Sequence, residues 1–174
     1  MIALFVLVAL GVVIWMMWSP AMAFVPGFAS LLQRPTGSFG VWPFMKGVET
    51  IGGEYQERST LLVLHHKRGR HSLGYLIVAM QPRGGTQVAT KYAGAFREWI
   101  REPAAREAWD DLELNRELKL SFDEGWMRAT WQPIGPFMFP GRFDADRWLG
   151  VLRSMHTVVA SLERGAAVPA SEPA

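Results

Sequence analysis

The chain has 174 residues, with 18 Lys and Arg, 16 Asp and Glu, four His and no Cys, and its formal net charge is +2. The lack of cysteine excludes disulfides, thiolate nucleophiles and Cys-ligated metal centres, and the small net charge does not indicate nucleic acid as a partner. All 34 charged side chains lie in residues 34–174, so the sequence divides into an uncharged apolar leader and a body with the charge content of a water-soluble domain.

Residues 1–18 predict a transmembrane helix. Every residue from Ile2 to Trp18 is apolar or Gly, and a helix of this length spans roughly 27 Å, close to the ~30 Å hydrocarbon core of a bilayer. A cleavable signal peptide is the alternative, because residues 21–23 (Ala-Met-Ala) have the small-x-small form of a cleavage site. The segment lacks the initial basic residue of a signal peptide, and Trp15 and Trp18 suit the membrane interface, so we expect a retained helix.

The basic residues nearest the leader predict its orientation. None precedes the helix, whereas Arg34 and Lys46 follow it before the first acidic residue. The positive-inside rule therefore predicts an inner or plasma membrane protein with its N-terminus outside and its C-terminal domain in the cytoplasm. The end of the leader, through residue 33, is broken by Pro26 and Gly27, and we expect it to run along the interface or to pack on a partner.

Residues 34–47 form a juxtamembrane linker that is rich in Gly and Pro. It carries Phe39, Trp42 and Phe44, which are large apolar groups that need cover from water. They can pack on the domain, dip into lipid headgroups or touch a neighbouring subunit.

Residues 48–165 predict an α+β cytoplasmic domain. Strands are expected over 54–66, after Gly52-Gly53, and over 72–80, with a hairpin between them; the second strand is apolar on both faces and is predicted to be central. Two short helices are expected between 90 and 112, the second running from Pro103 to Trp109. The clean alternation over 114–122, the turn at 123–125 and the strand over 126–132 predict a second hairpin.

The final predicted helix starts at an Asp144 cap and runs to Arg164, with Gly165 as the stop and a flexible tail over 166–174. One apolar stripe on this helix should cover the sheet; it comprises Trp148, Leu152, Met155, Val159 and Leu162. The predicted fold class is therefore α+β: one N-terminal transmembrane helix followed by an antiparallel sheet of two hairpins and four or more strands, covered by the long C-terminal helix.

A basic tip stands at the first predicted hairpin and comprises His66, Lys67, Arg68, Arg70 and His71. It can touch anionic lipid headgroups, or it can be a solvated turn whose charges discourage edge pairing. His66 and His71 would face each other across the hairpin, but a third metal ligand is missing from their neighbourhood, so we expect no metal site.

No motif in the sequence indicates catalysis or a cofactor. The paired carboxylates, such as Asp110-Asp111, sit at turns or helix ends, where acids act as caps. Hydrolase, zincin, phosphate-binding and dinucleotide motifs are all lacking, and the leader offers no axial ligand for a pigment or haem. His156 stands alone on the final helix and is interpreted as structural or partner-facing. We expect no catalytic residue, no metal and no cofactor.

The aromatic excess in loops predicts a non-catalytic, single-pass accessory subunit that braces a larger membrane complex, with other membrane-protein subunits and the lipid bilayer as partners and no nucleic acid. The candidate contact residues are Phe39, Trp42, Phe44, Phe137, Phe139 and Phe143. In layout alone, the chain resembles the H-type subunit of bacterial photosynthetic reaction centres, and respiratory and secretion complexes also contain single-span subunits of this kind. The alternatives are a membrane-tethered lipid- or small-ligand-binding module, with a pocket between sheet and final helix, and an enzyme without a recognisable signature.

Overall fold

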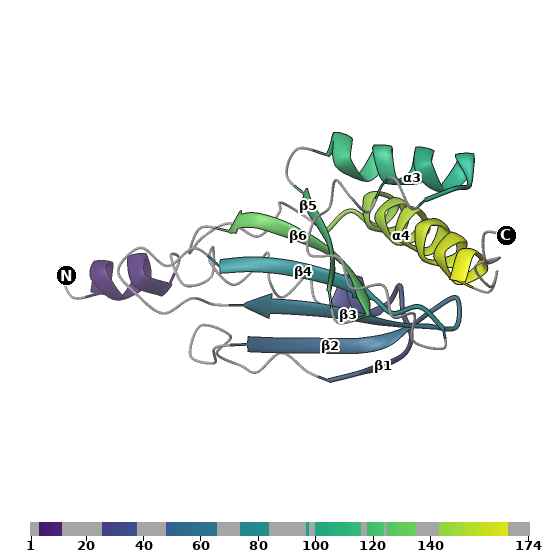
Figure 1. Cartoon of the computed structure of the whole chain (residues 1–174). Coiled ribbons are helices and arrows are strands. Elements are labelled where there is room, and N and C mark those ends of the chain that lie inside the picture. The colour runs from purple at the N-terminus through teal and green to yellow at the C-terminus, as the bar shows by residue number, and fades with distance from the viewer. Residues whose placement is uncertain are drawn as a thin grey trace, which may run out of the picture.

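The computed structural model describes residues 4–11, 26–37, 48–65, 74–83, 97, 100–115, 118–123, 125–134 and 143–166. These residues form a six-stranded antiparallel sheet with a long C-terminal helix, which confirms the predicted α+β class. Figure 1 shows helices α3 and α4 on the same side of the sheet. The strands follow one another in the order β1-β2-β3-β4-β6-β5, and their bounds are β1 Gln33–Thr36, β2 Val48–Tyr55, β3 Arg58–His65, β4 Gly74–Met80, β5 Leu118–Asp123 and β6 Trp126–Ile134.

The strand predicted over 54–66 is in fact part of two strands, β2 and β3. They pair from Val48↔His65 to Tyr55↔Arg58, so the turn between them contains only Gln56 and Glu57. Both residues have positive φ, 48° and 63°, as a two-residue type I′ turn requires. Such turns usually contain Asn or Gly, so the Gln-Glu pair does not predict a turn from the sequence.

Gly53 lies inside β2, although the sequence analysis placed Gly52-Gly53 before a strand. A Cβ on Gly53 would stand 2.8 Å from the Leu32 Cβ, so the glycine allows residues 26–32 to approach the sheet closely. Phe28 and Leu32 are buried in the core of this same domain, and β1 follows at the sheet edge. The end of the leader and the start of the expected linker are therefore part of the fold, because the apolar side chains of residues 26–32 find cover on β2 and α4.

The other predicted strands are confirmed, but the one expected over 114–122 begins only at Leu118, because Leu114 is the last residue of helix α3, Pro103–Leu114. β4 lies between β3 and β6 in the middle of the sheet, and its Leu76 and Val78 are 1% exposed. β5 alternates as expected, with Leu118, Leu120 and Phe122 buried and Lys119 exposed. It pairs with β6 through Asp123↔Trp126, and Gly125 supplies the positive φ, 77°, of the short connecting turn.

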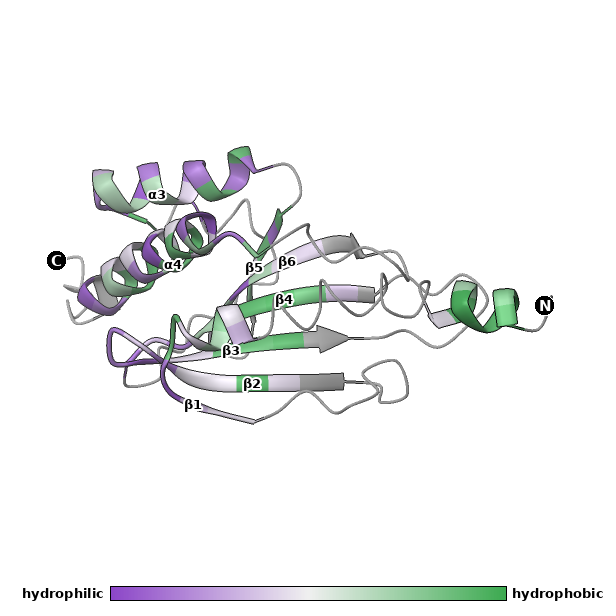
Figure 2. Ribbon diagram, turned by 180° about the vertical axis from the view of Figure 1, so that it is seen from behind, coloured by the Kyte–Doolittle hydropathy of each residue, from purple (hydrophilic) through white to green (hydrophobic). Residues whose placement is uncertain are grey.

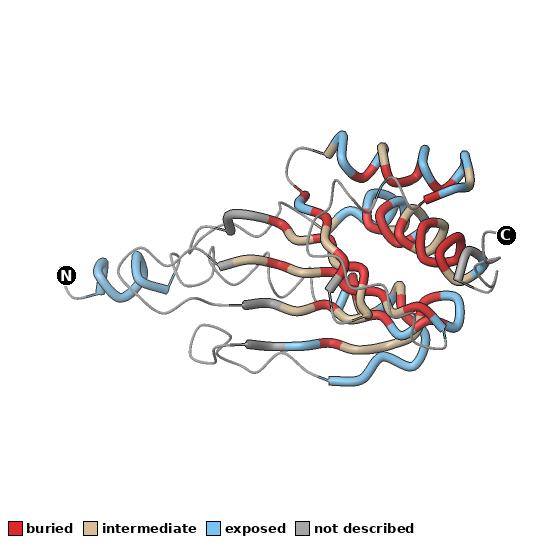
Figure 3. Tube along the Cα trace, in the orientation of Figure 1, coloured by how far each residue is buried: buried red, intermediate tan, exposed pale blue. Residues whose placement is uncertain are grey.

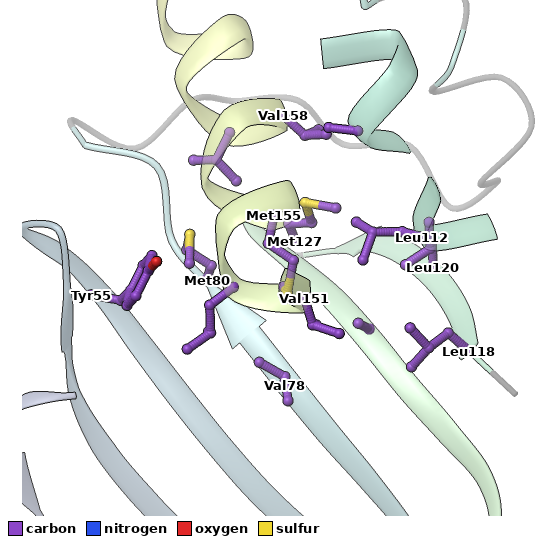
Figure 4. Packing of buried hydrophobic residues seen from close by; sticks show 14 of the residues in the cluster. Tyr55, Val78, Met80, Leu112, Leu118, Leu120, Met127, Val151, Met155 and Val158 are labelled. Atoms are coloured by element: carbon purple, nitrogen blue, oxygen red, sulfur yellow. The ribbon is translucent and has the colours of Figure 1, made fainter. Parts of the chain in front are cut away.

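Helix α4, Ala145–Ala166, lies over the sheet and buries the predicted stripe. Asp144 caps it as expected: Oδ1 accepts hydrogen bonds from the backbone N–H groups of Asp146 (3.1 Å) and Arg147 (3.2 Å). The helix ends one residue beyond Gly165. Figure 3 shows its buried side turned toward the buried face of the sheet, and Figure 4 shows Val151 and Met155 of α4 close to Met80 and Met127 of the sheet.

Helix α3, Pro103–Leu114, begins at the predicted proline and is longer than the sequence suggested. It packs mainly on α4 through Ala105, Ala108, Trp109 and Leu112. Of the helix expected ahead of it, Arg97 and Ile100 are among the described residues, and Ile100 is fully buried.

Of the predicted transmembrane helix, residues 4–11 are among the described residues, and the rest lies outside them. Residues 4–11 are helical and apolar, and Figure 2 shows this helix as a hydrophobic ribbon at the N-terminal end of the molecule. Within the described ranges, no helix has both the length and the apolar character needed for a membrane span.

Candidate functional site

A buried charged cluster, which we call the Arg58 cluster, joins the β2–β3 hairpin to α4. Arg58 is the first residue of β3, directly after the Gln56-Glu57 turn. His156 and Glu163 lie seven residues apart on α4, two helical turns, and so they share one face. Arg83 follows the end of β4 and completes the Arg58 cluster. Three segments far apart in the sequence thus meet at one end of the sheet.

The Arg58 guanidinium is held between β3 and α4 by a bidentate ion pair. Nε donates to Glu163 Oε1 (3.1 Å), and Nη2 donates to Glu163 Oε2 (2.6 Å). Arg58 is only 5% exposed. The Arg83 backbone N–H also donates to Glu163 Oε1, at 2.5 Å. Burial raises the pKa of Glu163, but the hydrogen bonds from Arg58 and Arg83 outweigh it, so that this pKa lies below its ordinary value.

His156 completes the contacts of the buried guanidinium. Its Nε2 is in hydrogen-bond contact with Arg58 Nη1, and its ring meets Tyr55 edge-on, with the two centroids 6.3 Å apart. Burial, followed by the positive charge of Arg58, lowers the pKa of His156 below its ordinary value, and the Glu163 carboxylate offsets part of this effect. The interpretation of His156 as a structural histidine agrees with these contacts.

The groups of the Arg58 cluster satisfy one another. Both carboxylate oxygens of Glu163 already accept hydrogen bonds, and the His156 nitrogen that could take a proton from a substrate is in contact with Arg58. A general base needs a free acceptor within reach of the reacting group. The geometry is therefore that of a structural ion pair that fastens α4 to the hairpin.

Two exposed ion pairs connect α3 and its N-terminal end to neighbouring segments. Arg164 of α4 forms a bidentate pair with Glu102 (2.7 and 2.5 Å), and Arg97 forms one with Asp110 (2.7 and 2.8 Å). The hydrogen bond from each arginine lowers the pKa of its partner carboxyl group. Exposed pairs of this kind orient elements more than they stabilise the fold.

A ligand-binding module was expected to have a pocket between the sheet and the final helix. In the described part of this interface the α4 side chains are buried, with Trp148 1% exposed and Leu152 and Met155 0% exposed. A hollow of about 260 Å³ lies between the end of α3, the start of β5 and the first turns of α4. It is lined by Asp111, Leu112, Asn115, Leu118, Asp146, Arg147, Gly150, Val151 and Ser154. This volume is below the usual range for a small-molecule site.

Large apolar side chains are exposed on the N-terminal helix. Leu4, Phe5, Val6, Leu7, Val8 and Leu10 are each between 55% and 78% exposed. The surface of a water-soluble protein rarely exposes so many large apolar side chains on one short helix. This helix is therefore typical of a segment that is covered by lipid or by another protein.

Two of the sequence-predicted contact and interface residues are described. Arg34 is exposed in the edge strand β1 and has a positive φ, 49°. Phe143 is half-buried and packs over Gly27 against the core, so its ring is covered at least in part by its own domain. The remaining ones lie outside the described residues; they are Trp15, Trp18, Phe39, Trp42, Phe44, Lys46, Phe137, Phe139 and the basic tip from His66 to His71.

The Arg58 cluster was missed by the sequence analysis. Arg58 lies 98 residues from His156 and 105 residues from Glu163, and no local pattern links an arginine to partners at such distances. Within the part of the chain that the structure describes, no group of three potential metal ligands is found. No family model matches the chain, and no curated protein or solved structure shows significant similarity to it.

Proposed function

We propose that this chain is a non-catalytic accessory subunit that is anchored in a membrane by its N-terminal leader and that braces a larger membrane complex with its α+β domain. The leader crosses the inner or plasma membrane once, with the N-terminus outside and the domain in the cytoplasm, where Arg34 and Lys46 face the inner headgroups. The complex is of a bacterial type, and bioenergetic assemblies such as a photosynthetic reaction centre or a respiratory complex fit the layout.

The exposed helix over residues 4–11 carries the proposal. Burying a large apolar side chain is worth roughly 1.5 to 3 kcal/mol, so transfer of the six exposed side chains into lipid supplies on the order of 10 kcal/mol. No charged side chain occurs before Arg34 to oppose that transfer. This free energy is of the same order as burial of one acyl chain in lipid, and it favours membrane binding of the leader.

The domain supports a bracing role rather than chemistry. Two of its polar groups with lowered pKa, His156 and Glu163, both contact the buried Arg58 and so hold α4 on the sheet. The aromatic loops that carry Trp42, Phe44, Phe137 and Phe139 contact other subunits. The basic tip contacts anionic lipid headgroups. These contacts follow from the excess of aromatic side chains over those that the described core uses.

A single extraction experiment tests the proposal. Membranes of the native source are solubilised in a mild detergent, and the full chain is followed by size analysis and by identification of co-eluting chains. The wild-type chain should be found in the membrane fraction and should elute with other subunits, well above its own 19.5 kDa plus micelle. A wild-type chain that elutes alone would contradict the accessory role.

Matched lysine variants test the anchor in the same assay. Leu10→Lys, near the middle of residues 1–18, should reduce the membrane-bound to soluble ratio by roughly two orders of magnitude, because a lysine at mid-helix costs about 2.5 to 3.5 kcal/mol. Leu114→Lys is the control, since Leu114 is 77% exposed but lies on α3. Equal membrane binding of the two variants would contradict anchoring by the leader.

A membrane-tethered lipid- or small-ligand-binding module is the second candidate. The hollow between α3, β5 and α4 favours it, because Leu112, Leu118 and Val151 offer an apolar floor with Asn115 and Ser154 among the lining groups. In the extraction experiment this candidate corresponds to a membrane-bound chain that elutes without partner subunits.

A further inference from the structure

The contact between Arg58 and His156 favours one protonation state of the histidine. A guanidinium group carries only N–H donors, so a hydrogen bond between Arg58 Nη1 and His156 Nε2 requires Nε2 to be the acceptor. We therefore assign a neutral imidazole with its proton on Nδ1. A second proton could only be added at Nε2, where it would point at an N–H of Arg58.

The surroundings of His156 are dominated by positive charge. The titratable and charged groups that face it come from every element packed around it: Tyr55 from β2, Arg58 from β3, Arg83 after β4, and Glu163 and Arg164 from α4. Glu163 is already paired with Arg58, Arg83 with Glu57, and Arg164 with Glu102. A protonated His156 would thus be in direct contact with the Arg58 guanidinium, while the carboxylate that favours its charged form, Glu163, is already paired with that arginine.

We propose that His156 is an acid-sensitive latch between α4 and the β2–β3 hairpin, which is closed when the imidazole is neutral and loosened when Nε2 takes up a proton. Protonation converts the acceptor of the Arg58 hydrogen bond into a donor and places two cations in contact. The ion pair between Arg58 and Glu163 then has to rearrange to separate them. The elements that loosen are the second half of α4 and the two-residue turn of the hairpin.

The pH window of the latch follows from linkage. Burial and the nearby arginines place the pKa of folded His156 below the ordinary value of 6.5, so the folded state binds fewer protons than the unfolded state between those two values. The stabilisation is complete above pH 6.5 and is lost as the pH falls through the folded pKa. Glu163 also has a lowered pKa, but its contribution is lost only below its ordinary value of 4.5, so the two effects occupy separate windows.

The size of the effect is bounded by the charge state of a free histidine. An unfolded histidine with a pKa near 6.5 is about 10% protonated at pH 7.5 and about 90% at pH 5.5, so a single such group shifts an opening equilibrium by at most about tenfold between these two conditions. A threefold to tenfold increase in opening is therefore expected. The apolar contacts of Leu152 and Met155, both fully buried, keep the rest of α4 in place, so the opening is local.

The test uses the full chain in mild detergent. Long-range ¹H–¹⁵N NMR of the imidazole should show Nε2 without a proton at pH 7.5 and a titration midpoint below 6.5. Hydrogen exchange at pH 7.5 and 5.5, corrected for the intrinsic pH dependence, should show threefold to tenfold more opening in residues 156–163 and 55–60 at the lower pH.

Two glutamine variants serve as controls. His156→Gln keeps an acceptor for Arg58 but cannot titrate, so its exchange should change less than twofold between the two pH values. His65→Gln removes a histidine at the opposite end of β3 from Arg58 and should respond to acid like the wild type. The same acid response in His156→Gln would overturn the proposal, and so would a wild-type midpoint at or above 6.5, which decides the question even if His156→Gln does not fold.

Discussion

Replacement of Arg58 by methionine should be among the most destabilising single changes in the domain. Methionine keeps much of the packing of the aliphatic stem but removes both hydrogen bonds to Glu163 and the contact with His156. Glu163 then remains as a largely buried carboxylate whose one remaining donor is the Arg83 amide. Loss of one partner of a buried pair costs about 3 to 5 kcal/mol, a large part of the 5 to 15 kcal/mol that stabilises a typical domain.

The assay is thermal and urea unfolding of the full chain in mild detergent, followed by tryptophan fluorescence. For a chain of this size, each kcal/mol shifts the melting temperature by roughly 2 to 4 °C, so Arg58→Met should melt about 6 to 20 °C below the wild type. Arg83→Met is the matched control: its side chain is 52% exposed, its ion pair with Glu57 lies at the surface, and the variant keeps the backbone N–H that Glu163 uses. The control should lose less than about 1 kcal/mol.

A second change separates the lone charge from the lost contacts. If the cost arises mainly from the unpaired carboxylate, Glu163→Leu introduced into the Arg58→Met background should recover part of the stability, because no buried charge then remains. Equal losses for Arg58→Met and Arg83→Met would refute the reasoning, since they would show that burial of the ion pair has no energetic consequence.

Two further predictions concern the core and the topology. Leu152→Ala should destabilise the domain by about 2 to 5 kcal/mol in urea unfolding, because Leu152 is 0% exposed at the centre of the α4 stripe; its exposed neighbour Arg153 changed to Ala should cost less than about 0.5 kcal/mol, and equal costs would show that the stripe is not the core. Ser171→Cys, the sole thiol in that variant, should react with an impermeant maleimide only after the membrane is opened; labelling of intact cells would reverse the proposed orientation.

The parts of the fold that were predicted correctly are those in which apolar residues recur at the regular spacing of a strand or a helix. The apolar residues Leu118, Leu120 and Phe122 alternate with polar ones, and the α4 stripe repeats every three or four residues, so neighbours in the sequence already reveal the buried face. The β2–β3 turn escaped prediction because Gln56 and Glu57 carry no turn signal, although the backbone adopts positive φ at both. Pairing over eight residues on either side outweighs the strain of that turn.

The parts that were not predicted depend on contacts between distant segments. In the sequence, Gly53 suggests a strand breaker, whereas in the structure Leu32 packs closely against it. In the sequence, Arg58 suggests an ordinary surface residue, whereas in the structure it forms an ion pair with Glu163. Neither relation has a spacing that recurs in sequences, because each is set by the way in which α4 and residues 26–32 come to rest on the sheet. The Arg58 cluster could therefore be found only in three dimensions.

The seating of Phe28 and Leu32 determines where the chain can be divided. A fragment cut at residue 34, where the uncharged stretch ends, would keep every charged residue yet lose Phe28, whose ring lies edge-on to Trp148 with centroids 5.7 Å apart. It would also lose Leu32 above Gly53 and one residue of β1, leaving part of the apolar surface of α4 and β2 in water. The folding unit thus includes residues 26–32, inside the uncharged stretch, and a fragment meant to fold on its own has to begin ahead of Phe28.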